Sequence, residues 1–66
     1  MEGRVVAYDA ARGRGTVESR DGHRFGFHCT RIADAPHDLA VGTPVRFRVV
    51  PGQLGAYEAD AVEASP

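Results

Sequence analysis

The chain has one cysteine, Cys29, and no lysine, asparagine or tryptophan. A single cysteine excludes an internal disulfide and argues against a disulfide-stapled secreted domain. No apolar run approaches the about 20 residues that a membrane-spanning helix needs, and the N-terminus lacks the apolar core of a signal peptide. These absences predict a cytoplasmic protein without a membrane segment.

The length of 66 residues predicts one small domain over residues 1–66, with a frayed tail at 63–66. A chain this short buries only about 60% of the surface that its unfolded form exposes. We therefore expect no deep catalytic cavity, and a binding function rather than an enzyme. The side chains expected in the core are Val5, Val17, Phe25, Phe27, Ile32, Leu39, Val45, Phe47, Val49 and Val62.

The net charge of −1 gives no overall basic signature for nucleic acid. The charges are unevenly distributed, since residues 1–31 carry six arginines against four acids and residues 32–66 carry two against five. The first half of the chain is therefore mildly positive and the second half negative.

Five short strands are predicted, separated by Gly-rich and Pro-containing turns. The first does not alternate cleanly between apolar and polar residues, so it is either buried on both faces or bulged. Residues 30–42 form a long connection with at most one helical turn, around 34–40, and residues 51–55 form a turn. Ile32 and Leu39 are expected to pin the long connection to the core. The predicted strands are residues 3–8, 14–19, 24–29, 45–49 and 57–63.

An Asp21-Gly22 turn between the second and third strands is the strongest hairpin signal in the chain. A two-residue loop would place Val17 on the face away from Phe25. A three-residue loop with Gly22 left-handed instead pairs Val17 with Phe25, and this register is preferred. It also pairs Glu18 with Arg24, Thr16 with Gly26, and Arg14 with His28.

This arrangement predicts an all-β fold, a small five-stranded antiparallel barrel. The oligonucleotide-binding (OB) fold fits best, and an SH3-like barrel is the alternative.

The stretch Arg12-Gly13-Arg14-Gly15 has two interpretations. Its glycines would let a phosphate backbone approach closely, and Arg14 could stack on a base. A tight turn with solvated arginines explains it equally well. Cys29 next to His28 superficially suggests a metal site, but no ligand spacing supports one, and neither a metal nor another cofactor is expected.

The order of these motifs resembles the bacterial cold-shock proteins over nearly the whole chain. The family's opening G-x-V-K-W-F-N aligns with residues 3–9. Its motif K-G-F-G-F-I aligns with residues 12–17, and V-F-V-H-F with residues 25–29. Its S-A-I and late L-x-x-G-x-x-V align with residues 30–32 and 39–45. The resemblance implies the OB barrel of cold-shock type.

The resemblance also implies binding of single-stranded RNA or DNA by stacking bases on surface aromatics, but most of these are replaced. The Trp position holds Ala7, and the two Phe of the first motif become Arg14 and Thr16. The second motif has Gly26 and Cys29 in place of its Phe residues. The stacking positions that remain are Tyr8 and His28, while Phe25 and Phe27 fall where the family has inward valines.

The first hypothesis is therefore weak, largely electrostatic and unspecific binding of single-stranded nucleic acid by a monomer. The second is a barrel that has lost this activity and binds a protein partner. Arginines clustered over the second and third strands would favour the first hypothesis, and arginines each neutralised by a neighbouring acid such as Glu18 would favour the second. The candidate nucleic-acid-binding residues are Tyr8, Arg12, Arg14, Thr16, Arg24, Gly26 and His28.

Overall fold

The computed structural model describes residues 1–33, 39–52 and 55–65. Within these ranges the chain is all-β, as predicted, and a short 3-10 helix, η1 (Cys29–Arg31), follows the third strand. The predicted helical turn at 34–40 lies mostly outside the described residues, and so do positions 53 and 54 of the turn predicted at 51–55. The strands are β1 (Glu2–Asp9), β2 (Arg14–Ser19), β3 (Arg24–His28), β4 (Pro44–Pro51) and β5 (Tyr57–Ala64).

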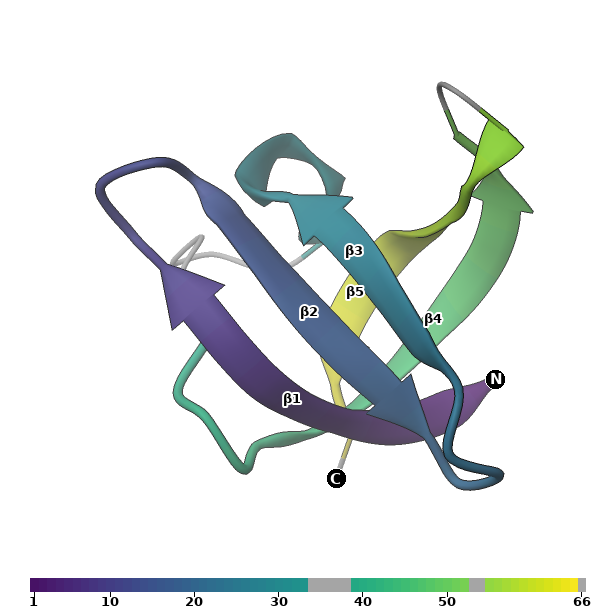
Figure 1. Cartoon of the computed structure of the whole chain (residues 1–66). Coiled ribbons are helices and arrows are strands. Elements are labelled where there is room, and N and C mark those ends of the chain that lie inside the picture. The colour runs from purple at the N-terminus through teal and green to yellow at the C-terminus, as the bar shows by residue number, and fades with distance from the viewer. Residues whose placement is uncertain (34–38, 53–54, 66) are drawn as a thin grey trace.

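The five strands close into a barrel in the order β1-β2-β3-β5-β4. β1, β2 and β3 lie side by side in one curved sheet, and β4 and β5 cross behind it (Figure 1). All neighbours are antiparallel except β3 and β5, which pair in parallel where Gly26 meets Glu58. This Greek-key closure is compatible with the predicted OB fold.

The hairpin between β2 and β3 has the predicted register. Val17 pairs with Phe25 and Glu18 with Arg24. Thr16 pairs with Gly26 and Arg14 with His28, as the three-residue loop requires. Gly22 has φ +89°, and the Ser19 N–H donates to the His23 carbonyl at 2.8 Å. The loop is therefore three residues long, which keeps Val17 and Phe25 on the same side of the sheet.

A bulge in β1 decides which of its side chains point inward. Val5 pairs with Val17 and Ala7 with Thr16, so Val6 is the extra residue. Strict alternation from the buried Val5 would turn Tyr8 outward, but one extra residue reverses the faces beyond it. Ala7 is exposed, and Tyr8 is half-buried and packs against the core. Of the two expectations for the first strand, burial on both faces or a bulge, the bulge is confirmed.

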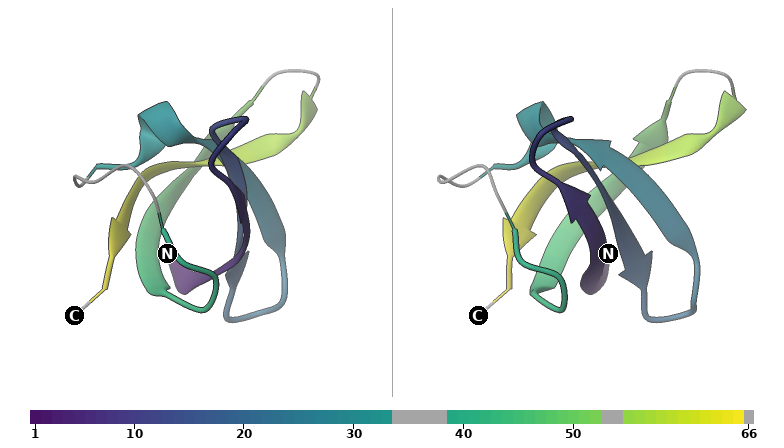
Figure 2. Two further views of the ribbon diagram at one scale, coloured as in Figure 1. Left: turned by 90° about the vertical axis from the view of Figure 1, so that its left-hand side faces the viewer. Right: turned by 60° about the vertical axis from the view of Figure 1, so that its left-hand side comes forward.

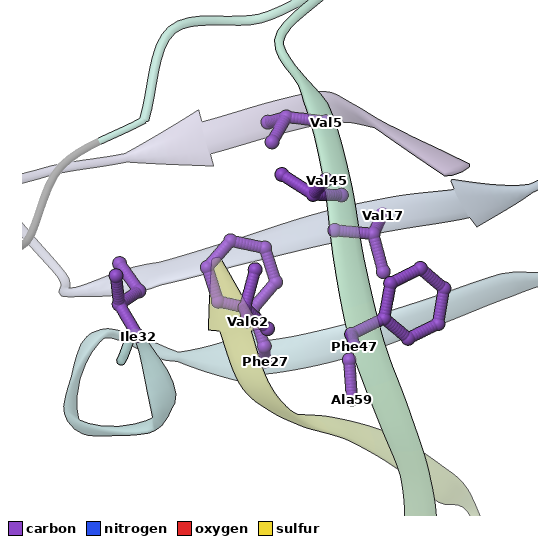
Figure 3. Packing of buried hydrophobic residues seen from close by; sticks show 8 residues of the cluster. All are labelled: Val5, Val17, Phe27, Ile32, Val45, Phe47, Ala59 and Val62. Atoms are coloured by element: carbon purple, nitrogen blue, oxygen red, sulfur yellow. The ribbon is translucent and has the colours of Figure 1, made fainter. Parts of the chain in front are cut away.

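The core contains the expected side chains and one more. Val5, Val17, Phe27, Ile32, Val45, Phe47 and Val62 are buried together with Ala59, which was not expected (Figure 3). The other expected residues, Phe25, Leu39 and Val49, are partly buried and pack against this cluster. Ile32 and Leu39 therefore anchor the long connection on both of its sides.

Several predicted boundaries differ from the observed ones, and β1 and β4 extend beyond the predicted residues 3–8 and 45–49. β3 ends at His28 because Cys29 begins η1. The expected frayed tail is instead tied to the barrel, since β5 continues to Ala64 and the Ser65 N–H donates to the Pro44 carbonyl at 2.8 Å. Among the described residues, no helix has the length and apolar character to cross a bilayer.

Asp60 of β5 connects this strand with η1 and β4. Its carboxylate accepts from Arg31 of η1 at 3.3 Å and from Arg48 of β4 at 3.4 Å. The neighbouring Ala61, which has φ +51°, donates its N–H to the same carboxylate. This N–H, and then Arg31, hold the pKa of Asp60 below its ordinary value of 3.8, although partial burial opposes them.

The lowered pKa of Asp60 predicts a loss of stability in acid. Because the folded state binds this proton less readily than the unfolded state, the stabilisation is complete above about pH 4 and is lost below it. Asp60→Asn should melt at a lower temperature at neutral pH, and its melting temperature should fall less between about pH 5 and pH 3. Thermal melts followed by circular dichroism measure both effects. An Asp60→Asn protein with the same pH slope as the parent would contradict the expectation.

Candidate nucleic-acid interface

An open surface hollow of about 800 Å³ lies over β2 and β3 and extends to the ends of β4 and β5. The β4–β5 ends project beyond the body of the barrel (Figure 2). Pro51, Gly52 and Glu58 from these ends line one side of the hollow. Four of the seven predicted site residues line this hollow, and they come from the face that the β2–β3 register defines. They are Arg14, Thr16, Gly26 and His28.

The other three predicted residues lie outside the lining of the hollow. The ring of Tyr8 stacks on Phe27, with centroids 6.1 Å apart and planes inclined by 13°. Tyr8 therefore packs against the inner side of the sheet, because the bulge at Val6 turns it inward. The predicted stacking of Tyr8 on a base would require its ring on the outer face. Arg12 lies 3.8 Å from Asp9 in an exposed ion pair, and Arg24 donates to Glu18 at 3.1 Å, as predicted.

Glycine at position 15 is required by the close approach of the Phe27 ring and the Ala7 carbonyl. Gly15 pairs with Tyr8 on one side and with Phe27 on the other. A Cβ there would lie 2.5 Å from Cζ of Phe27 and 2.9 Å from the Ala7 carbonyl oxygen. The stacked rings thus cover a residue that can carry no side chain. Gly26 differs, since the nearest atom to a Cβ there is 3.9 Å away.

Most charges of the described residues are paired. Six of the eight arginines form ion pairs with carboxylates, and Arg4 and Arg14 are the two without one in this part of the chain. Arg4 lies on β1 next to Glu18 and Pro44, away from the hollow. Arg14 is thus the one arginine of the hollow whose guanidinium has no carboxylate partner among the described residues, because Arg31 is held by Asp60 at 3.3 Å.

His28 is exposed at the rim where β3 ends. Its Nδ1 lies 3.4 Å from the Thr30 hydroxyl and 3.9 Å from Sγ of Cys29. Cys29 is half-buried against the core, and its N–H donates to the Gly13 carbonyl at 2.7 Å. Within the described ranges no three His, Cys, Asp or Glu side chains gather closely enough to hold a metal ion.

The hollow also includes residues that the sequence did not indicate. Thr30 and Arg31 enter it from η1, and Pro51, Gly52 and Glu58 enter it from the β4–β5 end. Glu58 is there because β5 runs parallel to β3, which sets it opposite Gly26. No local pattern in the sequence signals that contact.

No protein-family model matches this chain, and no curated protein matches it. The likeness to cold-shock proteins therefore rests on the order of motifs in the sequence. Its implications for binding are taken up as a proposal below.

Gly15→Ala tests the packing beneath the hollow. We expect it to lower the free energy of unfolding by about 1–3 kcal/mol, because the methyl group overlaps the Phe27 ring and the Ala7 carbonyl. Gly26→Ala is the matched control and should unfold within about 1 kcal/mol of the parent, with only the ordinary effect of replacing a strand glycine. Urea denaturation measures both. Equal stabilities of the two variants would mean that the Tyr8–Phe27 stack does not constrain position 15.

Proposed function

We propose that the domain binds single-stranded RNA or DNA in the hollow over β2 and β3, weakly and mainly through charge. The observation that carries the proposal is the unpaired guanidinium of Arg14 next to His28 in that hollow. In OB barrels the second and third strands and the loop between the fourth and fifth form the ligand face. The hollow occupies the same region.

Each lining residue has a role that fits its chemistry. Arg14 contacts a phosphate or stacks on a base, and the exposed ring of His28 stacks on a neighbouring base. Thr16 and Gly26 form a low floor that lets the strand lie close to the sheet. Arg12 and Arg24 contribute weakly at the margins, because each is neutralised by an acid. Tyr8 acts indirectly, by holding Phe27 under the floor.

The proposed binding module is cytoplasmic, monomeric and without catalytic activity. With so few stacking groups, phosphate contacts dominate its affinity, and the logarithm of the binding constant falls by about 0.7 per contact for each unit of log salt concentration.

A second function is supported by a separate observation. Since six of the eight arginines are neutralised by carboxylates, most of the surface offers little net attraction for a polyanion. Val41 and Tyr57 are also well exposed, at 65% and 63%. These features suit a protein partner, and a barrel that binds no oligonucleotide at low salt would favour this function.

Arg14→Gln tests the first proposal, with Arg4→Gln as its matched control. Each variant removes one exposed, unpaired arginine, but only Arg14 lines the hollow. Arg14→Gln should weaken binding of a short thymine oligonucleotide about tenfold and reduce the salt slope by about 0.7 to 1. Fluorescence anisotropy at several salt concentrations gives both values. Equal losses in the two variants would indicate attraction spread over the surface and would contradict a site at the hollow.

Gly26→Phe tests the same site by a gain of binding. A ring at this position has space on the outer face and adds a stacking platform beside His28. We expect tighter oligonucleotide binding by about 1–3 kcal/mol with an unchanged salt slope, because stacking releases no counterions. Gly26→Leu adds a side chain of comparable apolar character without a ring. If Leu improves affinity as much as Phe, or if neither does, base stacking over β3 is excluded.

A further inference from the structure

Glu58 has an unusual position in the hollow. It lies on β5, opposite Gly26 of β3 and next to Val50 of β4. Its half-buried side chain packs over Gly52, whose added Cβ would lie 2.5 Å from its Cγ and 2.6 Å from its Oε2. Glycine at position 52 therefore makes room for this carboxylate at one end of the hollow.

The charge of Glu58 is unmatched. Every other side-chain carboxylate of the described residues has an ion-pair or hydrogen-bond partner, from Glu2 with Arg20 to Glu63 with Arg46. Glu58 has none there, although Arg14, also unpaired, lines the same hollow. The hollow thus holds an unpaired cation and an unpaired acceptor that do not neutralise each other.

The distance between the two suits different parts of one ligand. Arg14 lies on β2 and Glu58 on β5, with β3 between them, so their backbones are roughly 10 Å apart across the sheet. Along the strand direction they are offset by two residues, which is about 7 Å. A nucleotide whose phosphate meets Arg14 can reach Glu58 with its base. A carboxylate only accepts hydrogen bonds, so the base it meets must offer donors.

We propose that Glu58 selects a base with an exocyclic amino group, and guanine above the others. Guanine presents two adjacent donors, N1–H and N2–H, to the two carboxylate oxygens. Adenine and cytosine offer one amino group each, whereas the single N–H of thymine or uracil lies between two carbonyl oxygens that repel a carboxylate. This inference rests on the proposed nucleic-acid binding. It adds a preference for one base, at the position that meets Glu58, to binding that is otherwise unspecific.

The test compares short thymine oligonucleotides that differ only at the central base. At low salt the wild-type protein should bind the oligonucleotide with a central guanine about tenfold more tightly than the all-thymine one, with adenine and cytosine between them. Glu58→Gln keeps the size of the side chain but replaces one acceptor oxygen with a donor, so it should lose most of this preference. Glu63→Gln removes a carboxylate that Arg46 already holds at 3.0 Å, and should keep the preference.

The outcomes separate this inference from the proposed function. Equal affinity of the wild-type protein for all four oligonucleotides, with binding still weakened by Arg14→Gln, would overturn the role of Glu58 and leave the proposed function standing. An equal gain in affinity for every oligonucleotide in Glu58→Gln, with the preference for guanine intact, would also overturn it, since the carboxylate would then only repel phosphate. No binding of any oligonucleotide would overturn both.

Discussion

The parallel contact between β3 and β5 is the constraint on which the rest of the structure depends. It turns two antiparallel units, β1-β2-β3 and β4-β5, into a closed barrel, and it does so at Gly26 and Glu58 with a further bridge from Ile32 to Val62. Closure buries Ile32 and Val62 in the common core, so the core of this short chain depends on it. The same contact brings the β4–β5 end beside β3 and η1, and so creates the hollow.

Three glycines line the hollow. Gly15 leaves room for the Phe27 ring, Gly26 leaves the outer face open, and Gly52 makes room for Glu58. Arg14 and Glu58 are unpaired, whereas most other charged side chains on the surface form exposed ion pairs. Each of these exposed pairs contributes little to stability. Apart from Arg4, the unpaired charged side chains of the described residues therefore lie at the hollow.

Much of the fold could be predicted because it depends on local patterns. The Asp21-Gly22 turn and the need to keep Val17 and Phe25 on one face gave the hairpin register, and with it Arg14, Thr16, Gly26 and His28 as neighbours. Tyr8 was kept as a stacking candidate because the uneven alternation of the first strand allowed a bulge but did not show that Val6 is the extra residue, which turns Tyr8 inward. Glu58 was missed because only the long-range closure of the barrel brings it to the site, and the periodicity of the sequence carries no information about that closure.

The most direct measurement is an NMR titration of isotope-labelled protein with a thymine oligonucleotide carrying one central guanine, at low and at moderate salt. Binding in the hollow predicts amide shifts that concentrate at Arg14, Gly26, His28 and Glu58 and that shrink as salt is added. Shifts confined to the region of Arg4, or no shifts even at low salt, would contradict it. In the latter case the search would turn to a protein partner for the exposed Val41 and Tyr57.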